Sequence, residues 1–99
     1  MDFFATAMRM SAGVMAWSLH FAVIYGYTGL ACARGWGHTV PPVVGAATIV
    51  GALATLAVIA AGYRDRARFE SWMMAAIGAF ALIGIVWEAI PALIVPVCG

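Results

Sequence analysis

Apolar residues fill three long stretches of the chain, and charged residues fall almost entirely between them. The uncharged stretches cover residues 10–33, 35–63 and 71–87, and the last continues past one acid to residue 98. A helix that crosses about 30 Å of hydrocarbon needs roughly 20 mainly apolar residues. Each stretch is long enough for one crossing. The pattern therefore predicts an all-α membrane protein with three transmembrane helices, at about 8–32, 42–63 and 70–92.

Short polar or proline-containing segments bound these helices. Residues 34–38 form a glycine-rich turn, and the Pro-Pro pair at 41–42 can open the second helix, where a missing N–H is harmless. Residues 64–70 hold the only charge cluster and are expected to lie in water between the second and third helices. Pro91 and Pro96 are expected to loosen or end the third helix. The whole chain, 1–99, is expected to form one three-helix transmembrane domain.

The arginines predict the orientation of the chain. With three crossings, Arg9, Arg64, Arg66 and Arg68 lie on one side of the membrane and Arg34 lies alone on the other. Because arginine-rich segments stay on the cytoplasmic side, we expect a cytoplasmic N-terminus and a periplasmic C-terminus. The expected location is a bacterial inner membrane.

Composition agrees with this class and excludes several others. Hydrophobic residues make up 66% of the 99 residues, only 9% are charged, and the mean hydropathy is +1.03. A soluble domain is about 45–50% apolar and about 25% charged, and so small a domain buries only about 60–70% of its surface. An ordinary soluble enzyme and a disordered tail are therefore excluded. The net charge of +1 offers no basic patch for nucleic acid.

The two cysteines fall at matching ends of two predicted helices. Cys32 ends the first helix and Cys98 follows the third, so both are expected on the oxidising side of the membrane, where disulfides persist. We expect a structural disulfide between them. The alternative is two small residues that fall near membrane edges.

Two ionisable residues lie within the predicted spans, where charge is costly and often functional. His20 is 11 residues after Arg9, about 16 Å into the bilayer, and Glu88 is 17 residues after Ser71, about 25 Å in. The depths differ by roughly 9 Å, so a direct pair between His20 and Glu88 is not expected.

Other partners are therefore expected for these two side chains. Glu88 is expected to accept a hydrogen bond from a nearby hydroxyl or from the Arg34 loop, or to stay protonated; the candidate hydroxyls belong to Tyr25, Tyr27, Thr28 and Thr48. His20 shares a helix face with Trp17, Ile24 and Tyr27. His20 is either a neutral side chain bonded to another helix or a functional group, namely a haem or quinone ligand or part of a proton relay.

Small residues recur every four positions on the second and third helices and predict close helix contacts. They are Ala47-Gly51-Thr55, Ala75-Ala79 and Ala76-Phe80-Gly84. Three helices leave large outward surfaces, so the chain is expected to join an oligomer or a larger assembly. Large side chains could anchor such a contact, and Trp17, Phe21 and Trp87 are the main candidates. No catalytic, phosphate-binding or metal-binding motif is present.

Two strings resemble a known group of proteins. Residues 17–21 (WSLHF), Tyr25 and residues 30–36 (LACARGW) resemble the first helix of small three-helix membrane proteins associated with caa3-type cytochrome c oxidases of proteobacteria, and residues 87–98 resemble their last helix. The resemblance implies a non-catalytic accessory subunit of a respiratory terminal oxidase. Such a chain would bind no cofactor or metal alone. Haem and copper would lie in the larger partner subunits, and lipid would cover the rest.

Two other functions remain open. The chain could be a small oligomeric transporter or channel in which Glu88 or His20 is the coupling site. It could also be an assembly factor that handles haem or copper transiently, which would require reduced Cys32 and Cys98. In none of these functions is the chain itself an enzyme.

Overall fold

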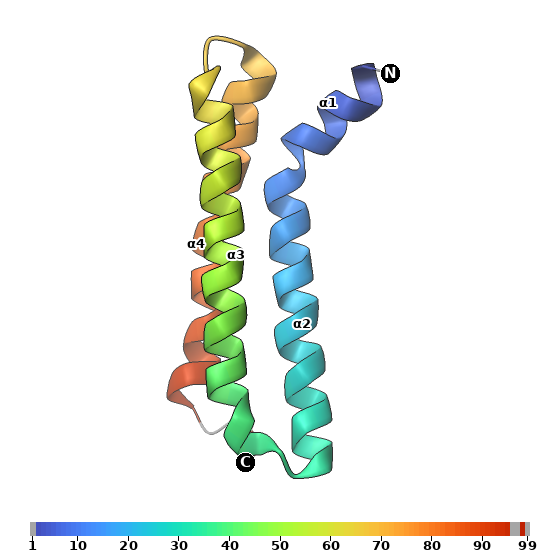
Figure 1. Ribbon diagram of the computed structural model, residues 1–99, viewed down its shortest axis with the longest axis vertical. Helices are drawn as coiled ribbons and strands as arrows, with labels where there is room; N and C mark the ends of the chain where they lie inside the picture. Colours follow the sequence, from blue (N-terminus) through green and yellow to red (C-terminus); the bar gives the residue numbers. More distant parts are fainter. Residues whose placement is uncertain (1, 96–97, 99) are drawn as a thin grey trace.

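The computed structural model describes residues 2–95 and 98, and these residues are helical almost throughout (Figure 1). The elements are α1 (Asp2–Met10), α2 (Ala12–Arg34), the short 3₁₀ helix η1 (Gly37–Thr39), α3 (Val40–Arg64) and α4 (Phe69–Ile94). The second, third and fourth α-helices are each long and apolar enough to cross a membrane. The predicted class, a helical protein with three membrane spans, is confirmed within the described residues. The orientation of the termini stays a prediction.

The three long helices form a thin, elongated bundle of 49 × 24 × 15 Å. The helices α3 and α4 lie side by side as a hairpin, and α2 runs antiparallel to α3 and parallel to α4 (Figure 1). One end of the bundle carries α1 and the α3–α4 loop, and we call it the arginine end. The other end carries the α2–α3 connection and Cys98, and we call it the cysteine end.

The first helix differs from its prediction. A single span at 8–32 was expected, but the chain forms two helices that meet at Ser11, and α1 leaves the bundle at an angle (Figure 1). The Ser11 hydroxyl donates to the carbonyl of Ala7 at 2.7 Å, and Gly13 follows two residues later. Serine that bonds back to its own helix, together with glycine, favours a kink. The membrane-crossing helix therefore begins at Ala12.

The second and third predicted spans are nearly correct. The Pro-Pro pair at 41–42 lies in the first turn of α3, as predicted. Pro91 lies in the last turn of α4, which continues three residues beyond it to Ile94, and the N–H of Val95 donates to the Pro91 carbonyl at 2.9 Å. The expected helix end at residue 92 is therefore two residues too early. Pro96 lies outside the described residues.

The core lies along one stripe of α4. Its buried positions are Ser71, Met74, Gly78, Ala81, Ile85 and Ala89. Steps of three and four residues keep these side chains on one face, which packs against both other long helices. Two glycines let the backbones approach: a Cβ on Gly62 would lie 2.6 Å from the Ser71 carbonyl oxygen, and one on Gly13 would lie 2.8 Å from the Gly78 Cα.

The expected small-residue faces are confirmed in part. Thr55 is fully buried, and Gly51 lies against Ile85, as close helix contact requires. Phe80, by contrast, points outward and is 76% exposed. Of the two residues on this face, only Gly84 lies against another helix, where it meets Trp17.

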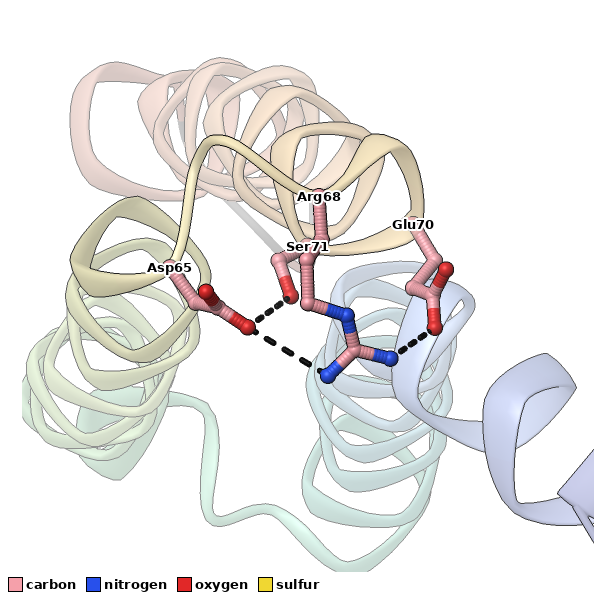
Figure 2. A network of polar contacts seen from close by, with 4 residues as sticks. All are labelled: Asp65, Arg68, Glu70 and Ser71. Atoms are coloured by element: carbon pink, nitrogen blue, oxygen red, sulfur yellow. Dashed lines mark hydrogen bonds and ion pairs between the residues drawn. The ribbon is translucent and has the colours of Figure 1, made fainter.

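The charge cluster between α3 and α4 forms a small network of exposed charged side chains with the buried Ser71 (Figure 2). The Arg68 guanidinium donates to Asp65 at 3.3 Å and also pairs with Glu70, and the Ser71 hydroxyl donates to the same Asp65 oxygen at 3.5 Å. Exposed ion pairs are worth about 0–1 kcal/mol. The network closes the short loop but contributes little to the stability of the bundle.

Candidate functional site

Three helices contribute one polar side chain each to the middle of the bundle. His20 on α2 places Nδ1 3.0 Å from Oε1 of Glu88 on α4, and its Nε2 lies 3.0 Å from Oγ1 of Thr48 on α3. We call these three residues the polar triad. The His20 side chain is 1% exposed and that of Glu88 12%. Both ring nitrogens of a buried imidazole are therefore satisfied by neighbouring helices.

The direct contact between His20 and Glu88 contradicts the sequence-based expectation. That expectation placed Arg9 and Ser71 at the same depth, whereas the kink at Ser11 and the helix packing shift α2 along α4. The indole of Trp17 packs on Gly84, where a Cβ would lie 2.9 Å from the ring.

The contact of Trp17 with Gly84 sets the relative height of His20 and Glu88. His20 comes three residues after Trp17, and Glu88 comes four residues after Gly84. The two therefore differ in height by one residue, about 1.5 Å, instead of 9 Å. Two of the partners expected for Glu88, a hydroxyl or the Arg34 loop, are likewise wrong, since the Glu88 carboxyl group contacts the imidazole instead. Thr48, one of those hydroxyls, bonds His20 instead.

The hydrogen atoms of the polar triad can be arranged in more than one way. Threonine can either donate or accept, whereas an imidazole nitrogen donates when protonated and otherwise accepts. A protonated Glu88 can donate to Nδ1 while the Nε2–H donates to Thr48. An ionised Glu88 can instead accept from the Nδ1–H of a neutral or charged imidazole. All these arrangements satisfy the same heavy-atom positions, so the geometry does not require one fixed protonation state.

The surroundings of the polar triad differ on its two sides. A hollow of about 210 Å³ between α2 and α4 reaches Glu88; it is lined by Ile24, Tyr25, Thr28, Glu88, Pro91, Ala92 and Val95. A larger groove of about 450 Å³ lies between α2 and α3 beside His20, and its other lining residues are alanine, leucine, valine and glycine. Glu88 thus faces the more polar space, and His20 the apolar one.

The cysteine end holds the other predicted site residues. The sulfurs of Cys32 and Cys98 lie at disulfide distance, with the two Cα atoms 5.6 Å apart, as the topology predicted. Tyr27 does not reach Glu88. Its hydroxyl lies 2.7 Å from that of Thr39, which in turn donates to the carbonyl of Trp36 at 2.7 Å. These contacts tie the α2–α3 connection to the end of α2.

The predicted interface residues lie on the outer surface along α2 and α4. Trp17, Phe21 and Tyr25 follow one another at four-residue steps, with ring centroids 6.0 and 4.5 Å apart. Phe80 and Trp87, at positions i and i+7 of α4, lie on one side of that helix. We call these five residues the aromatic face. Trp87 is 74% exposed, so most of its ring is available to lipid or to another protein.

Sequence reasoning missed the role of Thr48 as the partner of His20. The sequence suggests Thr48 only as a neighbour of Glu88. The available signal was that Thr48 is one turn of helix away from the small-residue series that contains Gly51, and a Cβ on Gly51 would lie 3.5 Å from the imidazole. Among residues 2–95 and 98, no group of three or more His, Cys, Asp or Glu side chains could hold a metal ion.

The fold defines a class: a multi-pass membrane protein with three apolar helices around a partly buried polar triad. No protein-family model, curated protein or solved structure matches this chain. The resemblance to small oxidase-associated membrane proteins accordingly stays a prediction.

Proposed function

We propose that the chain is a non-catalytic accessory subunit of a respiratory terminal oxidase, a cytochrome c oxidase complex, in a bacterial inner membrane. The observation that carries the proposal is the aromatic face, which stands outward on a bundle whose polar triad is paired internally. The choice of an oxidase as the complex rests on the strings around Trp17 and Trp87, which resemble oxidase-associated proteins.

The shape of the bundle favours a partner over an independent membrane protein. It is only 15 Å across its shortest dimension, so each helix presents most of its surface outward. Large aromatic side chains are the commonest anchors of protein interfaces. On the aromatic face they lie together on two helices, which favours a flat contact with a larger membrane subunit.

The cysteines weigh against a function as an assembly factor. A chain that transfers haem or copper through Cys32 and Cys98 needs free thiolates, because the thiolate is the metal ligand. The two sulfurs lie instead at disulfide distance. A pair held in this way supports a structural function at the cysteine end.

Copurification in mild detergent tests the proposal. The tagged chain is expected to bring down larger membrane subunits with a haem spectrum, and Trp87→Ala should lower their yield about tenfold, as loss of an interface anchor does. The matched control is Ile49→Ala on α3, where the side chain is also well exposed, at 63%. Recovery of the chain without haem-containing subunits, or equal losses in both variants, would contradict the proposal.

A second function, a small oligomeric transporter, is favoured by the polar triad alone. A half-buried carboxyl group paired with a buried imidazole is a suitable coupling site for proton-driven transport. This function predicts homo-oligomers by native mass spectrometry and a substrate flux that Glu88→Gln abolishes. A monomer with no flux in proteoliposomes would exclude it.

A further inference from the structure

We propose that the polar triad is a proton-binding site in which Glu88 and His20 share one exchangeable proton, and that this proton is exchanged only with the cysteine end. The proposal does not rest on the accessory-subunit function, because it concerns only contacts within the bundle.

The first argument is the proton balance of the pair. The reference state is an ionised Glu88 beside a neutral His20. When this pair takes up one proton, either Glu88 carries it and donates to Nδ1, or the imidazole carries it and donates from both nitrogens. The two forms interconvert when the proton passes across the 3.0 Å between Oε1 and Nδ1. One O–H bond breaks as one N–H bond forms, and both forms are neutral overall.

Loss of that proton also leaves every bond satisfied. The Glu88 carboxylate then accepts from Nδ1–H, and the Thr48 hydroxyl turns round to donate to Nε2, 3.0 Å away. The heavy atoms stay in place while the pair changes its charge by one. A side chain at position 48 that could only donate or only accept would not allow both protonation states.

The second argument is the hollow beside Glu88. It runs from Glu88 toward Pro91 and Val95, over the last two turns of α4, and so leads to the cysteine end. Tyr25 and Thr28 line it with Glu88 and provide hydroxyl groups. A volume of about 210 Å³ exceeds what one water needs, and water occupies a hollow only where polar partners are available. This hollow has both the volume and the polar groups that water needs.

The third argument is the lack of a comparable route on the other sides. The groove beside His20 is lined by apolar side chains apart from the imidazole itself, so water has no partners there. Toward the arginine end, α4 places Ile85 and Ala81 beneath Glu88, both buried. Within the described residues, the groups facing the pair are Tyr25 and Thr28 from α2 and Thr48 from α3; α4 adds only Glu88 itself.

Infrared and NMR spectroscopy of the protein in lipid nanodiscs test the shared proton. As the pH is varied, the carboxyl band of Glu88 and the ¹⁵N signals of His20 should change in one common transition. Glu88→Gln should remove that transition from His20, and His20→Gln should remove it from Glu88. Thr48→Val should change the His20 signals, whereas His38→Gln, in the exposed α2–α3 connection, should change neither.

Two separate transitions, or no transition at either residue while the disulfide and helix content are intact, would overturn the shared proton. These readouts are independent of any partner. The result therefore stands apart from the copurification test, and a failure of one proposal would be distinguishable from a failure of the other.

A rapid pH jump tests the direction of access. Thr28→Phe fills the hollow beside Glu88, and Val95→Trp narrows its mouth at an exposed position that tolerates a large side chain. Both should slow the infrared response of Glu88 about tenfold by displacing water. The matched control Ala46→Phe fills the apolar groove between α2 and α3 and should leave the rate unchanged. Slowing by Ala46→Phe alone, or by none of the three, would overturn the assigned route.

Discussion

Along the α3–α4 hairpin two backbones approach each other through small residues, whereas α2 is fixed to the hairpin by a few specific contacts. At Gly62 a single added methyl group would collide with backbone atoms of α4, and at Gly78 it would crowd the side chains of Val58 and Ile59 on α3. The α2 helix, by contrast, is flanked by hollows of about 210, 370 and 450 Å³. It is held at Gly13, Trp17 and His20 and by the Cys32–Cys98 pair.

The difference has a physical origin in the membrane. Lipid tails are as apolar as the helix surfaces, so helices associate through close packing and through polar bonds that lipid cannot provide. The hairpin uses the first means along its length, whereas α2 combines packing at Gly13 and Trp17 with the polar bonds of His20. Added side-chain volume at the helix contacts should therefore destabilise the hairpin most. Removal of polar or covalent links should loosen the attachment of α2 alone.

The largest effect is expected from Gly62→Ala. The new Cβ would lie 2.6 Å from the Ser71 carbonyl oxygen and 2.8 Å from the Ala75 nitrogen, so α3 and α4 must separate. We expect a loss of about 2–3 kcal/mol in the free energy of unfolding, the upper range for overpacking. Titration with a denaturing detergent measures this loss. Gly45→Ala, with no atom within 4 Å of its Cβ, is the matched control and should not destabilise the protein.

The next effect concerns the bond between His20 and Glu88. The single variants His20→Leu and Glu88→Leu each leave one buried polar group without its partner, whereas the double variant removes both. The same unfolding titration should therefore give a coupling energy of about 1–1.5 kcal/mol, near the upper end for polar contacts in membrane proteins. Additive free energies would mean that the contact contributes nothing to the position of α2.

A smaller effect is expected from Cys98→Ser. The pair closes a sequence separation of 66 residues, which in water would be worth about 4 kcal/mol of chain entropy. Because inserted helices remain in the membrane when they separate, we expect only about 1 kcal/mol here. Hydrogen exchange should increase at residues 35–40 and stay unchanged along α3 and α4. Faster exchange across the whole hairpin would contradict the division between the two regions.

The smallest effect is expected from Gly84→Ala. Its Cβ would lie 2.9 Å from the indole of Trp17, but that ring is partly exposed and can move outward. We expect a loss of about 0.5–1 kcal/mol in the free energy of unfolding, at the low end for overpacking. The loss should disappear when Gly84→Ala is combined with Trp17→Ala. If it persists, the helix register depends on a contact other than Trp17 with Gly84.

The amino-acid sequence by itself determined the number of helices that cross the membrane and the ends at which the cysteines fall. Apolar length fixes the first, because about 20 apolar residues span the hydrocarbon. Two crossings, α3 and α4, then separate Cys32 from Cys98, and an even number of crossings returns the chain to the same end. The Pro-Pro pair at 41–42 also marked the start of α3 correctly, because proline is compatible with the first turn of a helix.

Only the tertiary structure decided the height at which α2 lies against α4, and with it the polar triad. Residue counts from the helix ends separate His20 from Glu88 by about 9 Å. The kink at Ser11 and the contacts at Gly13 and Trp17 bring the two side chains together. In a membrane helix, apolar residues face both lipid and neighbouring helices, so hydropathy carries no signal for axial register. That register depends on which small residues meet, which is a property of two helices together.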